Sequence, residues 1–231
     1  ASDVYKRQIM YYNEYSKGED VMSKQLKNKE RRYNAIVDAG EKLLLERSAD
    51  SVQMQDIAKE AGLGVATLFR YFPKKQILII AVADKILSTE LDFYRAISQK
   101  QLTGIEKIEA VFQRANRLEH PELLKRSKFI DIFESNIDDF EEFQTAAADY
   151  FAIRNEISNI VSDIVEKGQA DQTLPSGEGV TDEIMTMINN YNMFARKLAL
   201  IKNIMALEKN PSPATQLKIM HDMYMSRLKN I

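Results

Sequence analysis

The chain has no cysteine and no tryptophan, and only eight glycines and five prolines occur among its 231 residues. The absence of cysteine excludes disulfides and thiolate metal sites, which suits a reducing cytoplasm. No apolar run reaches the roughly 18 residues that a membrane span needs, and no secretory signal pattern is visible, so we expect a cytoplasmic protein without a membrane partner. Alanine, leucine, isoleucine, methionine, lysine and glutamate recur, and this composition predicts an all-α fold.

The formal net charge of −2 looks unsuited to a nucleic-acid binder, but the charge is unevenly distributed. Residues 22–95 hold 13 lysines and arginines against 10 aspartates and glutamates, whereas residues 96–231 hold 16 against 20. This asymmetry has the sign expected if only the N-terminal part meets phosphate. It does not establish DNA binding by itself.

The segment from Val52 to Phe72 has the pattern of two short helices joined by a glycine-containing turn, which is typical of a helix-turn-helix. Ala58 is small where the second helix must cross closely, and Gly62 permits the left-handed conformation that ends the first helix. Leu68, at helical spacing from Phe72, packs the second helix against the first. The pattern indicates a DNA-binding protein.

Apolar periodicity and loop signals divide the rest of the chain. The first helix is expected from about Lys27 to Arg47, with a single apolar stripe formed by Ile36, Ala39, Gly40, Leu43 and Leu44. A later long helix is expected from Phe143 to Lys167, ended by Gly168. The predicted organisation is a disordered or non-native flank at 1–23, a helix-turn-helix domain at 24–73, a linking helix at 74–97 and a ligand-binding and dimerisation domain at 98–231.

Four pieces of the N-terminal region carry a family resemblance, namely Asp56-Ile57-Ala58, Ala61-Gly62-Leu63, Thr67 to Pro73, and Lys75 followed by Ile77-Leu78. Through them the chain resembles the TetR (tetracycline repressor) family of bacterial transcriptional regulators over roughly residues 30–85. The resemblance implies an N-terminal three-helix DNA-binding domain and a larger helical-bundle domain that binds ligand and dimerises. It also implies a homodimeric repressor that binds a palindromic double-stranded DNA operator and is released by a small-molecule effector.

The residues around the second short helix supply candidate DNA contacts. Val65 and Ala66 offer only apolar contact, suited to a thymine methyl group, whereas Arg70 suits a phosphate or a guanine. The resemblance places Thr67 and Tyr71 at phosphate, and Lys75 adds its charge to a helix dipole. The complete set of candidates is Lys27, Gln53, Gln55, Gly64, Val65, Ala66, Thr67, Arg70, Tyr71 and Lys75.

Three positions depart from the family pattern, and one basic cluster can be interpreted in two ways. Gly64 replaces the usual Ser, Phe69 replaces the usual Tyr, and Gln53 stands where a Ser or Thr often caps the helix. The basic cluster Lys24, Lys27, Lys29, Arg31 and Arg32 resembles a basic arm before the first helix, but a solvated helix start explains it equally well.

The C-terminal part gives weaker signals. Phe129, Phe133, Tyr150 and Tyr191 could line a small-molecule cavity, although aromatic residues at helical spacing are more often core. Two helices with apolar stripes are expected at about 182–207 and 213–230. These stripes are buried either within the monomer or against the same helices of a second subunit. The family resemblance favours the second alternative, a homodimer through these two helices. His120 and His221 are isolated, so we expect neither a metal nor a cofactor.

Two other functions stay open at this stage. A helical interaction protein that has lost DNA binding fits the departures at Gly64, Phe69 and Gln53. An enzyme that uses the C-terminal cavity fits less well, because no nucleophile–base motif, phosphate loop or metal cluster is visible, and no catalytic residue is predicted. In the regulator hypothesis, the helix at 74–97 transmits effector binding to the DNA-binding domain.

Overall fold

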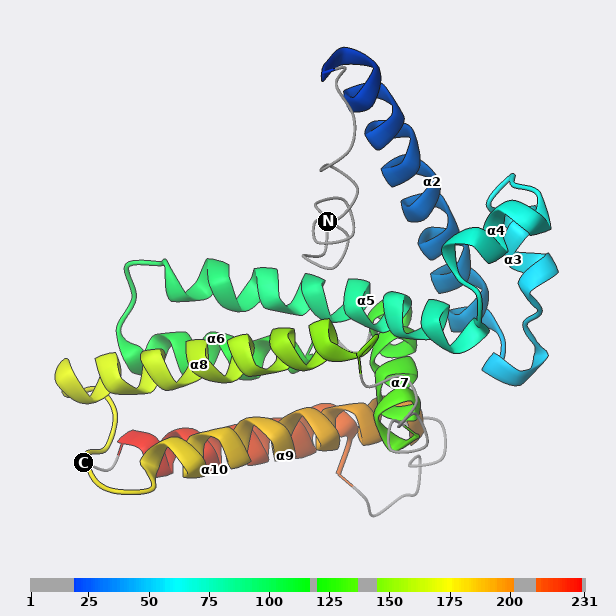
Figure 1. Cartoon of the computed structure of the whole chain (residues 1–231). Helices are drawn as coiled ribbons and strands as arrows, with labels where there is room; N and C mark the ends of the chain where they lie inside the picture. The colour runs from blue at the N-terminus through cyan, green and yellow to red at the C-terminus, as the bar shows by residue number, and fades with distance from the viewer. Residues whose placement is uncertain (1–18, 117–119, 137–144, 202–210, 230–231) are drawn as a thin grey trace. The chain divides into compact units, whose positions relative to one another are not determined.

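The structure, a computed structural model, describes residues 19–116, 120–136, 145–201 and 211–229 (Figure 1). Every regular element in these ranges is a helix, which confirms the predicted all-α fold. The helices, in chain order, are α2 (Glu19–Glu46), the short 3-10 helix η2 (Ala49–Ser51), α3 (Met54–Glu60), α4 (Val65–Tyr71), α5 (Lys75–Ser98), α6 (Gly104–Ala115), α7 (Pro121–Ser135), α8 (Ala148–Ala170), α9 (Val180–Ile201) and α10 (Pro213–Lys229). None of these described helices is both long enough and apolar enough to cross a membrane.

Two compact units divide the chain. The first comprises residues 1–88 and 129–153, and the second comprises residues 89–128 and 154–231, each represented by its described residues. Three helices, α5, α7 and α8, contribute residues to both units along the chain. The expected domain borders near residues 73 and 97 remain predictions.

The first described helix begins earlier than expected. Residues 1–18 of the predicted flank lie outside the described residues, but α2 starts at Glu19, eight residues before Lys27. The segment from Glu19 to Leu26 contains no glycine or proline and includes the good helix formers Glu, Met, Lys, Gln and Leu. It lacks the apolar periodicity on which the prediction depended, so the helix start was missed.

The first unit is built on the buried stripe of α2. All members of the predicted stripe are buried, namely Ile36, Ala39, Gly40, Leu43 and Leu44. A Cβ at Gly40 would lie 3.3 Å from Val82 Cγ2, so α2 and α5 approach closely there. Lys85 of α5 donates from Nζ to Asp38 Oδ1 of α2 at 2.7 Å and also pairs with Glu41.

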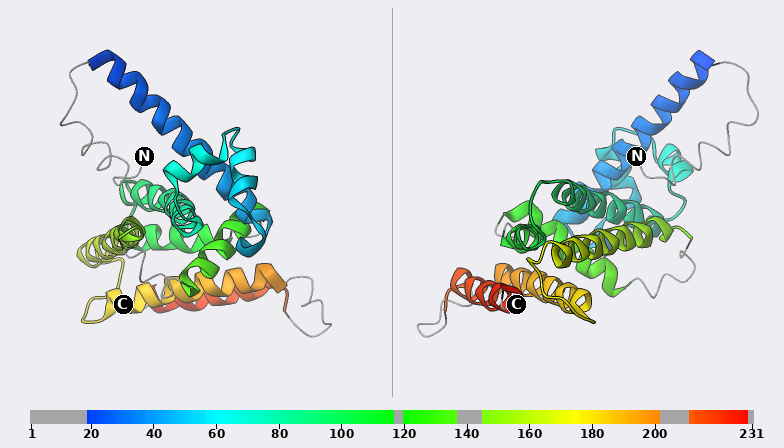
Figure 2. Two further views of the ribbon diagram at one scale, coloured as in Figure 1. Left: turned by 45° about the vertical axis from the view of Figure 1, so that its right-hand side comes forward. Right: turned by 90° about the vertical axis from the view of Figure 1, so that its left-hand side faces the viewer.

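The second unit has its core where α9 packs against α6 and α10. The ring of Phe112 lies 5.1 Å from that of Tyr191 and 5.8 Å from that of Tyr224. The views in Figure 2 show α9 and α10 side by side. The observed bounds of α10 agree with the prediction, whereas the part of the other predicted helix beyond Ile201 lies outside the described residues.

The junction of α6 and α8 corrects the expected role of Gly168. This glycine lies inside α8, which continues to Ala170, and it is not the residue at which the helix ends. Gln172 takes the left-handed conformation with φ 61°, and the N–H groups of Thr173 and Leu174 each donate to the Gly168 carbonyl at 2.9 Å.

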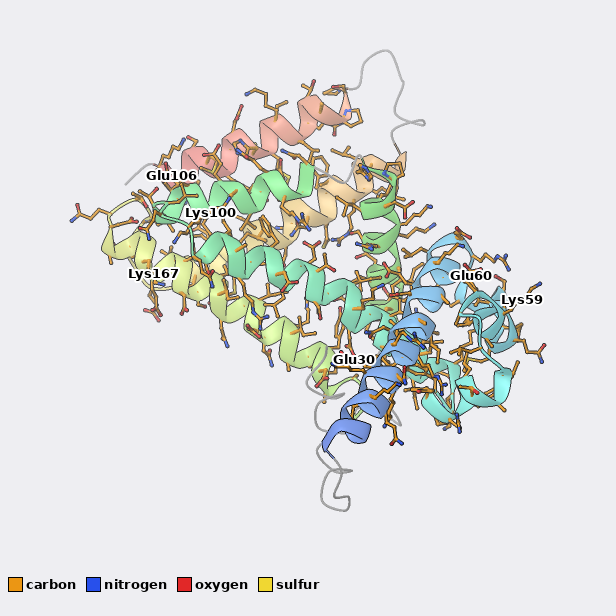
Figure 3. All side chains as sticks on the ribbon, turned by 90° about the horizontal axis from the view of Figure 1, so that it is seen from above. Glu30, Lys59, Glu60, Lys100, Glu106 and Lys167 are labelled. Carbon is orange, nitrogen blue, oxygen red and sulfur yellow. The ribbon has the colours of Figure 1, made fainter. Side chains whose placement is uncertain are left out.

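Gly168 is needed because another glycine lies against it. A Cβ on Gly104 would lie 2.2 Å from Gly168 Cα, a distance that backbone movement alone could relieve. Asp171 then receives the Gly104 N–H at 3.0 Å and the Thr173 hydroxyl at 2.6 Å. The hydrogen bonds from Thr173 and Gly104 hold the pKa of Asp171 below its usual value. At the same end of the unit, Glu106 accepts the Thr103 N–H at 2.8 Å (Figure 3).

We expect Gly104→Ala to destabilise the second unit by about 1–3 kcal/mol, since an added methyl group would overpack a backbone contact. Thermal unfolding followed by circular dichroism measures this loss. Gly64→Ala is the matched control, because no atom lies within 4 Å of a Cβ built there. Equal melting temperatures for the two variants would contradict the proposed close contact.

Candidate nucleic-acid interface

The turn between α3 and α4 forms as its residues dictate. Gly62 has φ 65°, the left-handed conformation that glycine tolerates. The N–H of Leu63 donates to the Ala58 carbonyl at 2.9 Å, and the N–H of Ala61 donates to that of Ile57 at 2.9 Å. These bonds satisfy the last carbonyls of α3 and turn the chain into α4.

The start of α3 is better capped than its N-cap residue, Gln53, suggests. Gln53 is the residue before α3, and the Asp56 carboxylate accepts the Gln53 N–H at 3.2 Å. This bond is the reciprocal half of a capping box, so Asp56 compensates in part for the missing Ser or Thr. The side chains of Gln53 and Gln55 are both exposed and available for contacts outside the domain.

One side of α4 is buried against the rest of the domain. Leu68 is fully buried and Phe72, at its end, is almost so, as the sequence predicted. The Phe72 ring lies 5.2 Å from that of Tyr33 on α2. Ala58 is buried on α3, which packs against both α2 and α4, and Lys42 Nζ lies 2.5 Å from Glu60 Oε1 between α2 and α3.

The opposite side of α4 is open and mostly apolar. Val65 is 37% exposed and Phe69 is 44% exposed, and Ala66 and Arg70 are exposed beside them. We call these four residues the α4 face. Gly64, also exposed, precedes the helix without a side chain that could cap it. The α4 face can make apolar contacts and one cationic contact, and Arg70 alone in it can donate side-chain hydrogen bonds.

The end of α4 and the start of α5 add polar groups. Tyr71 is the last residue of α4, and Lys75 is the first residue of α5; both side chains are half-buried, as is that of Thr67. The first N–H groups of a helix lack carbonyl partners within it and carry partial positive charge. The ammonium of Lys75 and the start of α5 could therefore both stabilise a phosphate group placed there.

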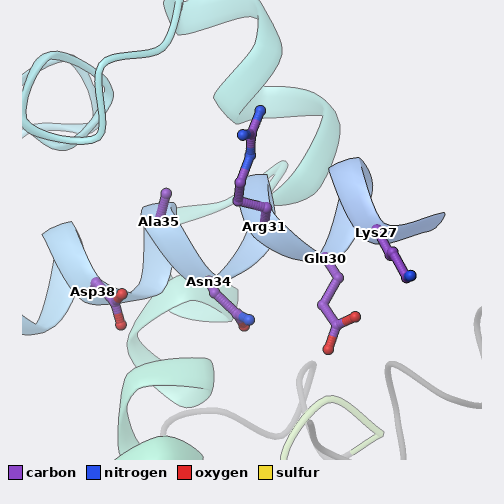
Figure 4. A pocket seen from close by; sticks show the side chains of 6 residues that line it. All are labelled: Lys27, Glu30, Arg31, Asn34, Ala35 and Asp38. Carbon is purple, nitrogen blue, oxygen red and sulfur yellow. The ribbon is translucent and has the colours of Figure 1, made fainter. Parts of the chain in front are cut away.

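The basic cluster of residues 24–32 is helical and is not an arm that precedes the first helix. Its five members lie within α2, because that helix begins at Glu19. Lys27, Arg31 and Arg32 are exposed. An open hollow along α2 is lined by Lys27, Glu30, Arg31, Asn34, Ala35 and Asp38. Figure 4 shows Arg31 projecting from the opposite side of α2 to Glu30 and Asn34.

Comparison with known proteins identifies the domain that carries these groups. Residues 36–82 match the family model of bacterial regulatory proteins of the tetR family. This segment runs from the buried stripe of α2 through α3 and α4 into α5. Residues 36–82 form a TetR-family domain. The match confirms the resemblance seen in the sequence.

Individual relatives support this assignment over limited lengths. The chain is 35% identical over 61 residues to an uncharacterized HTH-type transcriptional regulator, YvdT, of Bacillus subtilis, covering 26% of this chain and 31% of that protein. The chain spans less than half the length of each curated relative it matches. These relatives support the TetR-family domain and leave the second unit unassigned.

Solved structures share the fold across most of the chain. A regulator from Saccharomonospora viridis in complex with choline matches with a TM-score of 0.66 and 14% identity, covering 86% of this chain and 98% of that one. The regulator FadR from Bacillus subtilis in complex with stearoyl-CoA matches with a TM-score of 0.58 and 17% identity, at the same coverage. The described helices beyond the TetR-family domain thus belong to a fold that such regulators also have.

The four aromatic residues predicted to bind ligand are divided between the two units. Phe129, Phe133 and Tyr150 belong to the first unit, where the rings of Phe133 and Tyr150 lie 4.9 Å apart. Tyr191 belongs to the second unit and donates its hydroxyl to Asn116 Oδ1 at 2.8 Å. All four are buried. Their role in ligand binding stays a prediction.

Phe69 is the residue of the TetR-family domain that sequence reasoning undervalued. Compared with the usual Tyr, Phe69 lacks a hydroxyl that could reach phosphate, but the structure places its exposed ring on the α4 face. The signal was present, since Phe69 is four residues after Val65 and thus one helical turn along the same face. Both positions therefore present an apolar side chain to solvent on this face.

We expect Lys75→Ala to weaken DNA binding for every sequence and to lower the slope of log K against log salt by about one per domain, because one phosphate contact is lost. Tyr71→Phe removes a single hydroxyl and should weaken binding without changing that slope. Fluorescence anisotropy at several salt concentrations measures both effects. The control is Lys100→Ala, which changes an exposed lysine of the second unit (Figure 3). If Lys100→Ala lost as much DNA affinity as Lys75→Ala, the assignment of Lys75 to a phosphate contact would be contradicted.

Proposed function

We propose that the protein is a homodimeric transcriptional regulator that binds an operator in double-stranded DNA and responds to a small-molecule effector. The observation that carries the proposal is the two-sided character of α4, with Leu68 and Phe72 inside and the α4 face outside. A helix supported in this way can enter a major groove with its outer residues against base edges. The TetR-family domain and the transcriptional regulators to which the chain is similar support this proposal.

We also infer from the α4 face which features of the operator bases the protein recognises. Val65, Ala66 and Phe69 lack donors and acceptors, so they discriminate bases through contact with the thymine methyl group. Arg70 adds a guanine or phosphate contact, and Gln55 adds amide groups from α3. Specificity then depends on methyl groups, a few polar contacts and the shape of the DNA.

The dimer is proposed to form through α9 and α10, which pack against each other. Large apolar side chains remain exposed on both helices, with Met193 at 58% and Met223 at 64%, and Leu200 and Ile219 at about half. Leu200 lies seven residues after Met193, and Met223 four residues after Ile219, so each pair shares one helix face. Symmetry-related copies of these faces would bury apolar area that one chain leaves in water.

The effector is proposed to act by favouring one of two arrangements of the dimer, and thus changing its affinity for the operator. Two of the structures that share this fold hold chemically different ligands, choline in one and stearoyl-CoA in the other. The comparison therefore supports a ligand-responsive regulator without fixing the chemistry of its ligand. A repressor is the form of regulation proposed, with release from DNA when the effector binds.

The proposed base contacts predict a dependence on thymine methyl groups. Replacing thymine by uracil in the half-sites of an operator obtained by selection from random DNA should weaken binding about fourfold for each contacted methyl group, since a buried methylene-sized group contributes ~0.8 kcal/mol. Titration of labelled DNA measures this change. The Phe69→Ala variant should bind equally well to DNA with thymine and to DNA with uracil at the base that Phe69 contacts. Uracil outside the half-sites is the control, and an equal effect there would contradict direct contact.

The proposed interface predicts that charge on its exposed methionines separates the dimer. Met193→Glu combined with Met223→Glu should convert a dimer into a monomer, because carboxylates would be buried without partners. Sedimentation velocity distinguishes the two masses. Ile132→Glu, which changes another exposed apolar residue (52% exposed) on α7, should leave the dimer intact. A doubly substituted protein that stays dimeric would place the interface elsewhere.

Operator binding also separates this proposal from its competitor. Sequence-selective binding that weakens with salt is the result expected of a regulator. A protein that binds no DNA even at low salt would favour a helical interaction protein, for which the α4 face contacts another protein. The departures at Gly64 and Phe69 are the features of the sequence that would then explain the loss.

A further inference from the structure

The four residues of the α4 face form two rows along the helix. Val65 and Phe69 are about one turn apart, and so are Ala66 and Arg70, because residues four positions apart are neighbours on a helix surface. The first row, which we call the apolar row, carries the two large side chains, at 37% and 44% exposure. The second row carries the small Ala66 and the exposed Arg70. Apolar contact is therefore offered beside a hydrogen-bond donor.

A pyrimidine base presents two groups to the major groove that a protein can recognise separately. Thymine has a methyl group at C5 and an acceptor, O4, whereas cytosine has a hydrogen at C5 and an amino donor, N4. 5-Methylcytosine combines the methyl group of thymine with the amino group of cytosine. A surface that contacts only the C5 position therefore treats 5-methylcytosine as it treats thymine.

The α4 face can recognise the C5 group but has no side chain that accepts from the amino group. Val65, Ala66 and Phe69 contain no side-chain nitrogen or oxygen, and Arg70 donates hydrogen bonds without accepting any. The methyl group is thus the feature that distinguishes one pyrimidine from another for the apolar row. Cytosine is not selected by its amino group here.

The neighbouring helix α3 does not supply the missing acceptor from a carboxylate. Asp56 accepts the N–H of Gln53 at 3.2 Å, and Glu60 Oε1 lies 2.5 Å from Lys42 Nζ. These are the two acidic residues of α3, and both bind groups of their own domain. Gln55 is exposed and has both a donor and an acceptor, so its amide does not exclude either pyrimidine.

The second row suits a guanine next to the methylated base. Adjacent base pairs follow each other at about 3.4 Å along the duplex, and a turn of α-helix rises about 5.4 Å. Side chains of the two rows can therefore meet adjacent base pairs. Arginine recognises the O6 and N7 acceptors of guanine. A methylated cytosine that precedes a guanine offers a methyl group to the apolar row and two acceptors to Arg70.

We propose that the α4 face recognises 5-methylcytosine as it recognises thymine, so that methylation of cytosine within an operator half-site strengthens binding. The inference rests on the function proposed above and adds a form of regulation at the same site. Modification of the DNA, in addition to the effector, then controls how much of the operator is occupied.

Four versions of one operator test the proposal. A half-site thymine whose replacement by uracil weakens binding is located first. That position then carries thymine or uracil opposite adenine, or 5-methylcytosine or cytosine opposite guanine. Fluorescence anisotropy compares the four duplexes at a salt concentration low enough for all of them to bind. The methyl group should strengthen binding about fourfold within each base pair, because the same methyl group is buried in both.

Substitutions in the apolar row identify the side chain responsible. Either Val65→Ala or Phe69→Ala should remove the methyl effect at this position, and should remove it from both base pairs together, because one side chain makes both contacts. Circular dichroism checks that the variants keep their helices. Leu102→Ala is the matched control, since it shortens an exposed apolar side chain (38% exposed) of the second unit. This variant should show the full methyl effect.

Three results would overturn the inference: no thymine methyl group affects binding, 5-methylcytosine binds no better than cytosine, or the methyl effect survives both substitutions in the apolar row. Preference for the selected operator over an unrelated fragment is measured on the same preparations. Any of these results with that preference intact would reject the recognition of methylated cytosine and leave the regulator standing. Absence of a preferred operator would instead reject the proposed function.

Discussion

Burial of Leu68 and Phe72 is the interaction on which the candidate interface depends. The helix that carries the α4 face, Val65–Tyr71, has seven residues, and an isolated helix of that length does not persist in water. It exists because Leu68 is fully buried and because Phe72 packs its ring 5.2 Å from that of Tyr33. The same contacts fix which residues face outward, so packing inside the domain determines what the surface presents.

The sequence predicted the fold well where apolar periodicity meets a turn signal. The buried stripe of α2, the turn at Gly62 and the all-α architecture follow from spacing and from glycine chemistry. Helix ends were less predictable. Glu19 begins α2 in a stretch with helix-forming residues but no periodicity. Gly168 lies inside α8, where it allows the close backbone approach of Gly104, 64 residues earlier. Contacts between distant segments leave no local signal.

The candidate site was predictable to the level of the helix and less so to the level of the side chain. Val65 and Ala66 are exposed as expected, but the exposure of Phe69 emerged only from the structure. The burial of Asp84 on α5 was hidden in the sequence, because an aspartate in a long amphipathic helix is ordinarily solvated. Its burial depends on how α5 packs, and that burial, followed by the charge of Asp149 65 positions later, raises its pKa to about 8.

The central claim is that the α4 face contacts DNA bases. Its most direct test is a titration of the unmodified protein and of Phe69→Glu against one selected operator and one unrelated fragment. The unmodified protein should prefer the operator, and the folded variant should lose that preference, because a carboxylate replaces an apolar contact and meets the negative potential of the duplex. Equal preference for the operator by both proteins would contradict the account.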